Sequence, residues 1–174
     1  ISITDGQIFL ESDLFFAGMR PAVNVGLSVS RVGGAAQTKA MKKASGSIRI
    51  DLAQYREMEV FTQFSSDLDE ATKAQLAYGS CLMELLKQPL CNPLKLHEQV
   101  ITLWTATHKK MVHVDKKQIK QYQKDMLTYF DNVYPEIGRE IDETKVLSDE
   151  LGEKILQAAD EFNSRMSEES QTSR

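Results

Sequence analysis

Residues 33–47 read Gly-Gly-Ala-Ala-Gln-Thr-Lys-Ala-Met-Lys-Lys-Ala-Ser-Gly-Ser, and the character of the sequence changes within this stretch. Residues 35–44 are rich in Ala, Lys, Met and Gln, which are good helix formers, so we predict a helix there. Ser45-Gly46-Ser47 then breaks that helix. Because apolar residues recur at helical spacing from this point onward, we predict a mainly α fold.

The segment before the stretch has a different pattern. Ile1–Thr4 leads into the turn signal Asp5-Gly6, and Val-rich alternation over Ala22–Ser30 suits a strand or its exit loop. Two or three strands are not a stable sheet by themselves. We therefore expect residues 1–34 to be a remnant of an α/β domain and the chain to be an excised piece.

The remaining sequence predicts a helical bundle. An Asp67–Glu70 pair resembles a capping box, Pro135 closes one helix, and Asp149 and Glu150 suit the first turn of another. We expect residues 35–166 to form the helical domain and residues 167–174 to be a frayed, disordered tail. The predicted helices after residue 47 cover residues 48–64, 67–86, 96–108, 116–134 and 148–166.

Four of these helices show a face at helical spacing. The helix over residues 96–108 places Val100, Trp104 and Thr107 on one face. We expect another face to be formed by Leu68, Thr72, Leu76, Gly79, Met83 and Leu86. A third is formed by Ile119, Tyr122, Met126, Phe130 and Val133. The last is formed by Leu151, Ile155, Ala158, Phe162 and Met166.

The composition is that of an ordinary globular protein. A 174-residue chain with 41% hydrophobic and 26% charged residues is neither disordered nor collagen-like. The net charge of −4 disfavours non-specific electrostatic binding to nucleic acid or acidic lipid. Two cysteines are too few for a disulfide scaffold, and no apolar run approaches the length of a membrane-spanning helix.

Local motifs for catalysis or metal binding are incomplete. Residues 34–39 lack the second glycine and the following Ser or Thr of a phosphate loop. His97-Glu98 begins like a zinc-protease helix, but Ile101 stands where the second histidine is needed. His108 and His113 do not stack on one helix face, and the spacing of the two cysteines is too long for a paired-ligand motif. We therefore predict no metal site.

Longer stretches of the sequence are more specific for a protein family than its short motifs are. Over nearly its whole length the chain resembles the alpha subunit of the F-type rotary ATP synthases, less so after Asn92. The longest matching stretches are Ile1–Glu11, Leu27–Lys42, Leu52–Glu57 and Phe64–Asp69, and Leu85–Gln88 and Ser148–Leu151 also fit.

The resemblance implies the end of a P-loop nucleotide-binding domain followed by the C-terminal helical domain. In the family, alpha subunits alternate with beta subunits in a hexamer around the gamma rotor subunit, and the complex uses ATP or ADP with magnesium. Arg31 matches the arginine finger that reaches the phosphate of ATP held by beta. Ser28 matches a serine required for activity, and Ser2 matches another at the same interface, where a hydroxyl can reach phosphate, Arg31 or its own backbone.

The alpha subunit of this family also holds a nucleotide that is not turned over. Phe15, Arg20 and Pro21 match positions that line this non-catalytic site, and Gln88 matches one of two glutamines near the adenine. Leu90 stands at the position of the second glutamine, which weakens the expected recognition of adenine.

The resemblance therefore implies a regulatory subunit of a complex that couples ion translocation to ATP synthesis or hydrolysis. We expect it to be peripheral to the cytoplasmic face of a bacterial plasma membrane, which it reaches only through the assembled complex. We expect no ATP hydrolysis by the chain alone, because it contains no phosphate loop and no recognisable magnesium ligand. The alternative is a stand-alone helical protein-interaction module; a phosphate loop upstream in the same reading frame would support the ATP synthase subunit instead.

Overall fold

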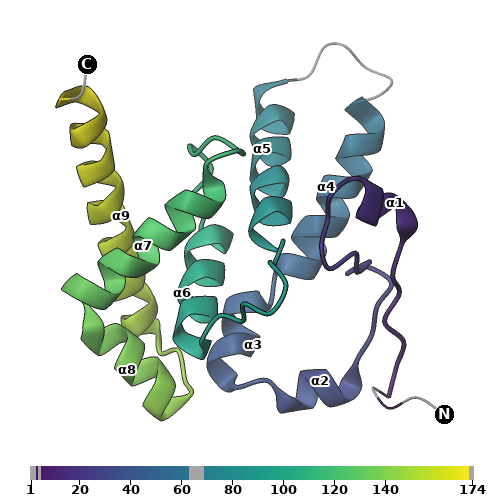
Figure 1. The fold of residues 1–174 in the computed structure, drawn as a ribbon, viewed down its shortest axis with the longest axis horizontal. Helices are drawn as coiled ribbons and strands as arrows, with labels where there is room; N and C mark the ends of the chain where they lie inside the picture. The colour runs from purple at the N-terminus through teal and green to yellow at the C-terminus, as the bar shows by residue number, and fades with distance from the viewer. Residues whose placement is uncertain (1–2, 4, 63–68, 173–174) are drawn as a thin grey trace. The chain divides into compact units, whose positions relative to one another are not determined.

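A computed structural model describes residue 3, residues 5–62 and residues 69–172 of the chain. The described residues are mainly helical and form no strand, which confirms the predicted fold class (Figure 1). The extended pairing found among them is an isolated antiparallel bridge between Leu10 and Val23. The Val-rich segment over residues 22–30 is therefore mostly loop.

The chain divides into two compact units. The first unit consists of Ile1–Gln37 and Gly46–Pro93, and the second of Thr38–Ser45 and Leu94–Arg174. The helices of the first unit are α1 (Ser12–Phe16), α2 (Arg31–Ala36), α4 (Ile48–Thr62) and α5 (Glu70–Leu85). Those of the second are α3 (Lys39–Ser45), α6 (Leu96–Thr107), α7 (Ile119–Val133), α8 (Pro135–Thr144) and α9 (Asp149–Thr172).

Helices α4 and α5 pack against each other in the first unit. The ring of Tyr55 on α4 lies directly over Gly79 on α5, where a side chain would leave no room for it. The Tyr78 hydroxyl on α5 donates to Asp51 Oδ2 on α4 over 2.9 Å. An apolar contact and a hydrogen bond therefore fix the same pair of helices.

The buried face of α5 differs from the predicted one. Its buried residues are Tyr78, Gly79, Cys81, Leu82 and Leu85. Of the predicted face, only Gly79 is buried, while Thr72, Leu76, Met83 and Leu86 are half-exposed; Leu68 lies outside the described residues. Tyr78 can be buried because its hydroxyl keeps a partner, which a count of apolar positions does not register.

The helix predicted over residues 35–44 is two helices. Helix α2 begins at Arg31 and ends at Ala36, and Gln37 is extended, with φ −62° and ψ 139°. Thr38 then accepts the backbone N–H of Met41 on its Oγ1 at 3.1 Å, and α3 begins at Lys39. A hydroxyl that can cap a helix start competes with continuation of the preceding helix.

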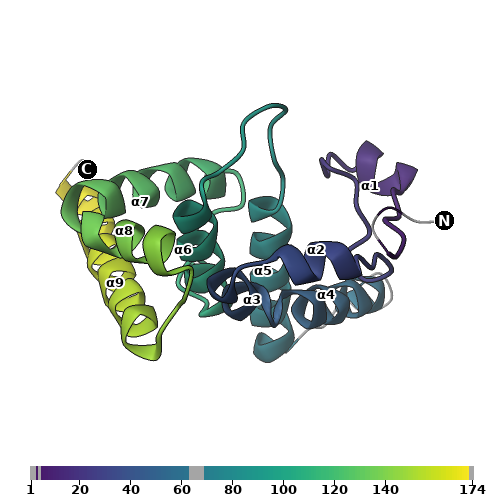
Figure 2. The same cartoon turned by 90° about the horizontal axis from the view of Figure 1, so that it is seen from below.

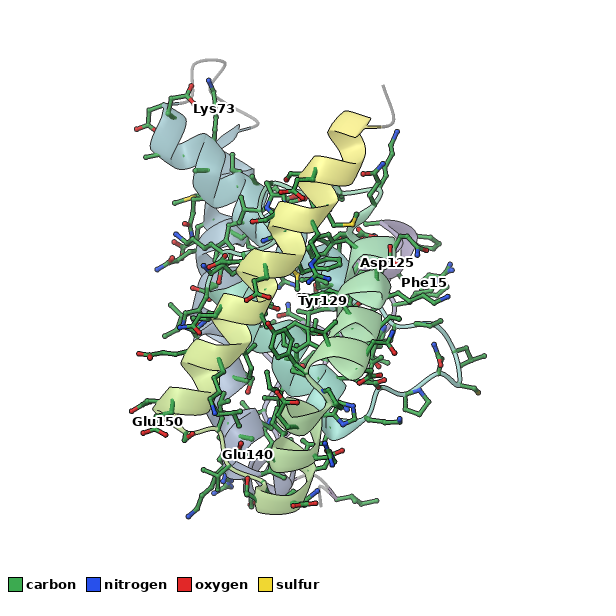
Figure 3. All side chains as sticks on the ribbon, turned by 90° about the vertical axis from the view of Figure 1, so that its left-hand side faces the viewer. Phe15, Lys73, Asp125, Tyr129, Glu140 and Glu150 are labelled. Carbon is green, nitrogen blue, oxygen red and sulfur yellow. The ribbon has the colours of Figure 1, made fainter. Side chains whose placement is uncertain are left out.

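The second unit has a core formed by α6, α7, α8 and α9, which lie side by side in both views (Figures 1 and 2). Of the predicted faces, all of α7 is buried except the exposed Val133, and all of α9 except the half-exposed Met166. Trp104 on α6 donates its indole N–H to the Gly152 carbonyl of α9 over 3.0 Å. Further along α9, Phe162 contacts Tyr129 of α7, with ring centroids 5.4 Å apart; Tyr129 is labelled in Figure 3.

Helix α8 is absent from the predicted set. Pro135 does follow the end of α7, but it also occupies the first turn of α8. The fixed φ of proline suits this position, where the missing N–H would have no partner inside the helix. Ile137 and Ile141 of α8 are buried in the core.

Two more helix starts are capped by polar side chains. Asp69 caps α5 by accepting the Thr72 N–H at 2.7 Å; the predicted partner Asp67 lies outside the described residues. Ser148 accepts the Leu151 N–H at 3.1 Å and precedes α9, as predicted. Among the helices of the described residues, none combines the length and apolar content that crossing a bilayer requires.

Candidate functional site

Arg31 is the first residue of α2, and an aspartate holds its guanidinium. Its Nη2 donates to Asp5 Oδ1 at 3.1 Å, and its Nε lies 3.1 Å from Asp5 Oδ2. The Arg31 side chain is 76% exposed and that of Asp5 is 57% exposed. The Ser30 hydroxyl accepts the Gly33 N–H and so starts the helix at Arg31.

The Asp5 segment reaches Arg31 because Gly6 has no side chain. A Cβ on Gly6 would lie 2.1 Å from the Val29 carbonyl oxygen, which no side chain tolerates. Beside this contact, the Val29 N–H donates to the Gln7 carbonyl over 2.8 Å. The Asp5-Gly6 turn signal seen in the sequence therefore has a specific use, since it brings a carboxylate to the start of α2.

The Ser28 hydroxyl stabilises the same pair of segments. Its Oγ accepts the backbone N–H of Phe9 at 3.0 Å. The hydroxyl still has a proton to donate, because a serine oxygen can accept and donate at once. Ser2 lies outside the described residues.

The four residues predicted for a nucleotide site come together in the first unit. The Arg20 guanidinium carbon lies 4.7 Å from the centroid of the Phe15 ring. The Arg20 carbonyl accepts the Gln88 N–H at 2.8 Å, and Pro21 follows Arg20 through a cis peptide bond. Phe15, at the surface in Figure 3, is 47% exposed, and Arg20, Pro21 and Gln88 are also exposed.

This arrangement places an exposed planar cation against an exposed aromatic ring, with Gln88 bonded beside them through its backbone. Such groups suit a ligand that combines negative charge with a planar ring. Leu90 is 94% exposed, so its side chain makes few contacts with the rest of the protein.

Two features of these groups were missed in the sequence. Asp5 was read as a turn residue and is the ion-pair partner of Arg31. Asn24 is buried, donates from Nδ2 to Glu11 and accepts the Leu27 N–H on Oδ1 at 3.0 Å. A polar residue inside a Val-rich run was the available signal for Asn24.

The Cys81 thiol is not an activated nucleophile. Burial raises the pKa of the Cys81 thiol to about 11, so little thiolate forms near neutral pH. Cys91 is exposed, and both cysteines are free thiols.

Comparison with known proteins gives the family. A sequence model described as "ATP synthase alpha/beta chain, C terminal domain" matches residues 37–162. This range covers more than half of the chain, so the chain belongs to that family. Of the predicted site residues, Gln88 lies inside the matched range, whereas Arg31 and the residues around Phe15 precede it.

The relatives found are alpha subunits. The chain is 50% identical over 165 residues to ATP synthase subunit alpha of Aquifex aeolicus (strain VF5), covering 95% of this chain and 33% of that protein. It is 54% identical over 162 residues to ATP synthase subunit alpha of Clostridium botulinum (strain Eklund 17B / Type B), and 51% identical over the same length to that of Clostridium kluyveri. Both matches cover 93% of this chain and 32% of the relative, so the chain spans about a third of the length of these proteins.

Proposed function

We propose that the chain is part of the alpha subunit of an F-type ATP synthase and provides the arginine finger that completes the catalytic site of the beta subunit. The observation that carries this proposal is the state of Arg31. Its guanidinium is exposed, oriented by two contacts to Asp5 and placed at the start of a helix. This exposure leaves the guanidinium accessible to a phosphate on a neighbouring subunit.

The contact with Asp5 orients the Arg31 guanidinium but leaves it able to exchange Asp5 for another anion. An exposed ion pair contributes at most about 1 kcal/mol, so a phosphate oxygen can compete with the carboxylate. Phosphoryl transfer develops charge on the equatorial oxygens, and the planar fork of arginine donates two hydrogen bonds to them. Asp5 therefore acts as a rest position for Arg31 until the ATP of a neighbouring beta subunit is in reach.

Substitution of Arg31 in the assembled complex tests the proposal. Arg31→Ala should reduce ATP hydrolysis by about 10³- to 10⁵-fold while nucleotide binding changes little. Arg31→Lys should recover little of the loss, because lysine keeps the charge without the fork. Arg139→Ala, which removes an exposed arginine of α8, is the matched control and should be active. Near-normal turnover of Arg31→Ala would exclude the arginine finger.

Phe15, Arg20, Pro21 and Gln88 form, in this proposal, part of the non-catalytic site, which holds ATP or ADP with magnesium. Their proximity supports it, since Arg20 joins the other members through its ring contact and its carbonyl. With Leu90 in place of an amide, adenine should be recognised less selectively. Comparing ATP and GTP binding in the hexamer with that of a Leu90→Gln variant tests this; an unchanged preference would show that Leu90 is neutral.

The proposed partners are the beta and gamma subunits, with the helices after residue 34 packed around the rotor and residues 1–34 joined to the nucleotide-binding domain. The match of the family model from residue 37 supports this boundary. Exposed apolar side chains also support it, because such surfaces mark contacts with other protein. Those of the first segment include Leu10, Phe16, Leu27 and Val32. The complex would lie at the cytoplasmic face of a bacterial plasma membrane.

A further inference from the structure

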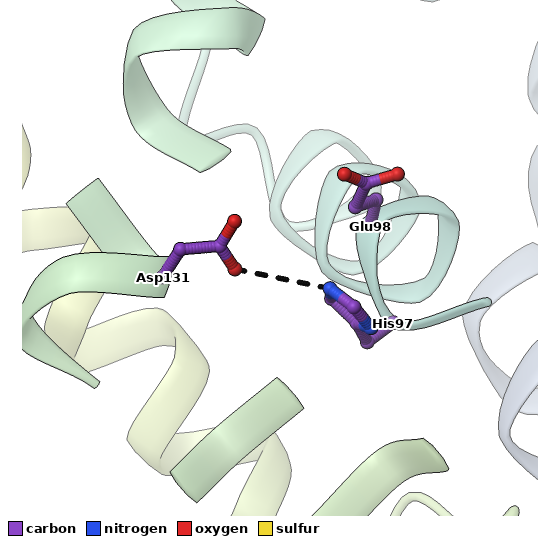
Figure 4. Close-up of side chains that lie close together, drawn as sticks. All are labelled: His97, Glu98 and Asp131. Atoms are coloured by element: carbon purple, nitrogen blue, oxygen red, sulfur yellow. Dashed lines mark ion pairs between the residues drawn. The ribbon is translucent and has the colours of Figure 1, made fainter. Parts of the chain in front are cut away.

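Three groups that can bind a metal ion lie close together in the second unit. His97 and Glu98 belong to the first turn of α6, and Asp131 lies on α7. One ligand atom of each residue lies within 4.8 Å of those of the other two (Figure 4). Local spacing in the sequence gives no sign of this cluster, because Asp131 is brought to His97 by helix packing.

The buried histidine is the group that points to a ligand. The His97 side chain is only 10% exposed. Its Nδ1 lies 2.6 Å from Asp142 Oδ2 on α8. Its Nε2 makes no hydrogen bond within the part of the chain that the structure describes; Asp131 Oδ1 lies 3.8 Å away, beyond hydrogen-bond length. The His97 side chain is thus nine-tenths buried, and its Nε2 faces the Asp131 carboxylate at ion-pair distance.

The bond to Asp142 defines the chemistry of the other nitrogen. In the neutral ring, a proton on Nδ1 is donated to Asp142, and Nε2 then presents a lone pair. A carboxylate–histidine pair of this kind orients metal-binding imidazoles and raises their basicity. A lone pair facing the Asp131 carboxylate is unfavourable, and either a proton on Nε2 or a cation between the two groups removes the repulsion.

The geometry points to a binding site for a zinc-class divalent cation formed by His97 Nε2 and the carboxylates of Asp131 and Glu98. Two carboxylates and a neutral imidazole balance the charge of such an ion, and three protein ligands leave one position for water. Because magnesium and calcium prefer oxygen ligands alone, the imidazole selects against them.

The surroundings hold the three ligands in place. Glu98 Oε2 accepts the Lys95 N–H at 2.6 Å in a capping box, and the carboxylate keeps further lone pairs for an ion. Helix α8 covers the ring of His97 at Gly138, where a Cβ would lie 3.3 Å from His97 Cδ2. A bound ion would thus connect α6 to α7, with Asp142 of α8 as the positioning residue.

The test is a titration of the 174-residue protein with Zn²⁺ and with Co²⁺ as a spectroscopic substitute, followed by calorimetry and visible absorption. Every protein carries Cys91→Ser, because that exposed thiol could bind zinc by itself. His97→Ala and Asp131→Asn remove ligands, Asp142→Asn removes the orienting carboxylate, and His113→Gln is the matched control. Asp131→Asn changes a side chain that is 55% exposed, so the fold should survive it.

We expect one equivalent of Zn²⁺ to bind and to raise the thermal midpoint, whereas Mg²⁺ has no effect. Asp142→Asn should weaken binding by about 10- to 100-fold, the loss usual for an outer-shell partner. His97→Ala and Asp131→Asn should weaken it at least as much, and His113→Gln should leave it unchanged. No binding to the parent protein would overturn the site. Equal affinity in Asp131→Asn would overturn it as well, and would mean an adventitious ion only.

Discussion

The ring of Tyr55 lies so close to Gly79 that a Cβ on the glycine would come within 2.3 Å of the ring atoms. This contact sets the separation of α4 and α5, since any side chain at residue 79 must displace the ring. The bond from the Tyr78 hydroxyl to Asp51 is made next to it, so both depend on the same approach.

We predict that Gly79→Ala destabilises the protein by about 1–3 kcal/mol, as overpacking usually does. Gly34→Ala is the matched control, because residue 34 also lies in a helix and a Cβ there meets nothing within 4 Å. It should be neutral or stabilise by up to about 1 kcal/mol, the advantage of alanine over glycine in a helix. Urea unfolding measures both; equal changes in the two variants would contradict the prediction.

Gly6→Ala should separate the Asp5 segment from residues 28–31. Its Cβ would meet the Val29 carbonyl, which is backbone and cannot rotate away. We expect the Val29 amide, now bonded to Gln7, to exchange its hydrogen faster, while amides of α4 and α5 keep their protection. Gly26→Ala serves as control, since its closest contact, 3.4 Å from Asn24 Oδ1, is ordinary. Unchanged exchange at Val29 would show that the segment adapts.

How far the sequence predicts this fold depends on the strength of each helical pattern. Helix α7 was predicted with its buried face because Ile119, Met126 and Phe130 repeat at helical spacing. The face of α5 was wrong because alanines fill its surface and its buried positions include a tyrosine. Helix α8 was missed because a proline ends one helix as readily as it begins the next.

The candidate site was predictable only residue by residue. The sequence stretches around Arg31 and Gln88 identified both as candidate site residues, since motifs of that length are specific to a family. Their partners were not identifiable, because the contact of Arg31 with Asp5 depends on a close approach between two loops. The neighbours of His97 come from α7 and α8 for the same reason. Tertiary packing determines these contacts, and they cannot be predicted from the spacing of residues in the sequence.

If Asp5 is only a rest position for Arg31, its charge is dispensable. Asp5→Asn should change the free energy of unfolding by less than about 1 kcal/mol, because the pair is exposed. In the assembled complex it should retain far more ATP hydrolysis than Arg31→Ala, since the guanidinium is still present. A loss as severe as that of Arg31→Ala would give the Asp5 carboxylate a direct part in the reaction.

The tyrosines between the helices of the first unit should make the protein sensitive to alkali. Burial raises the pKa of Tyr55 to about 12, helped by the charge of Glu59 and the hydrogen bond to it. The pKa of Tyr78 is also raised, first by burial and then by its bond to Asp51. The unfolded protein has the ordinary tyrosine value of 10.0, so between pH 10 and 12 the folded protein holds more protons.

The contribution of Tyr55 to stability is therefore complete below pH 10 and is lost as the pH rises toward 12. Tyr55→Phe removes this titration, so its stability should fall less between pH 8 and 11 than that of the parent protein. At pH 8 the variant loses the bond from the hydroxyl to Glu59, worth about 0.5–1.5 kcal/mol. Urea midpoints at pH 6, 8 and 11 measure this. The two proteins should run parallel from pH 6 to 8, where tyrosine does not titrate, and converge above pH 10 as the parent loses its advantage. Parallel behaviour up to pH 11 would mean that Tyr55 ionises in the folded protein as readily as in the unfolded one.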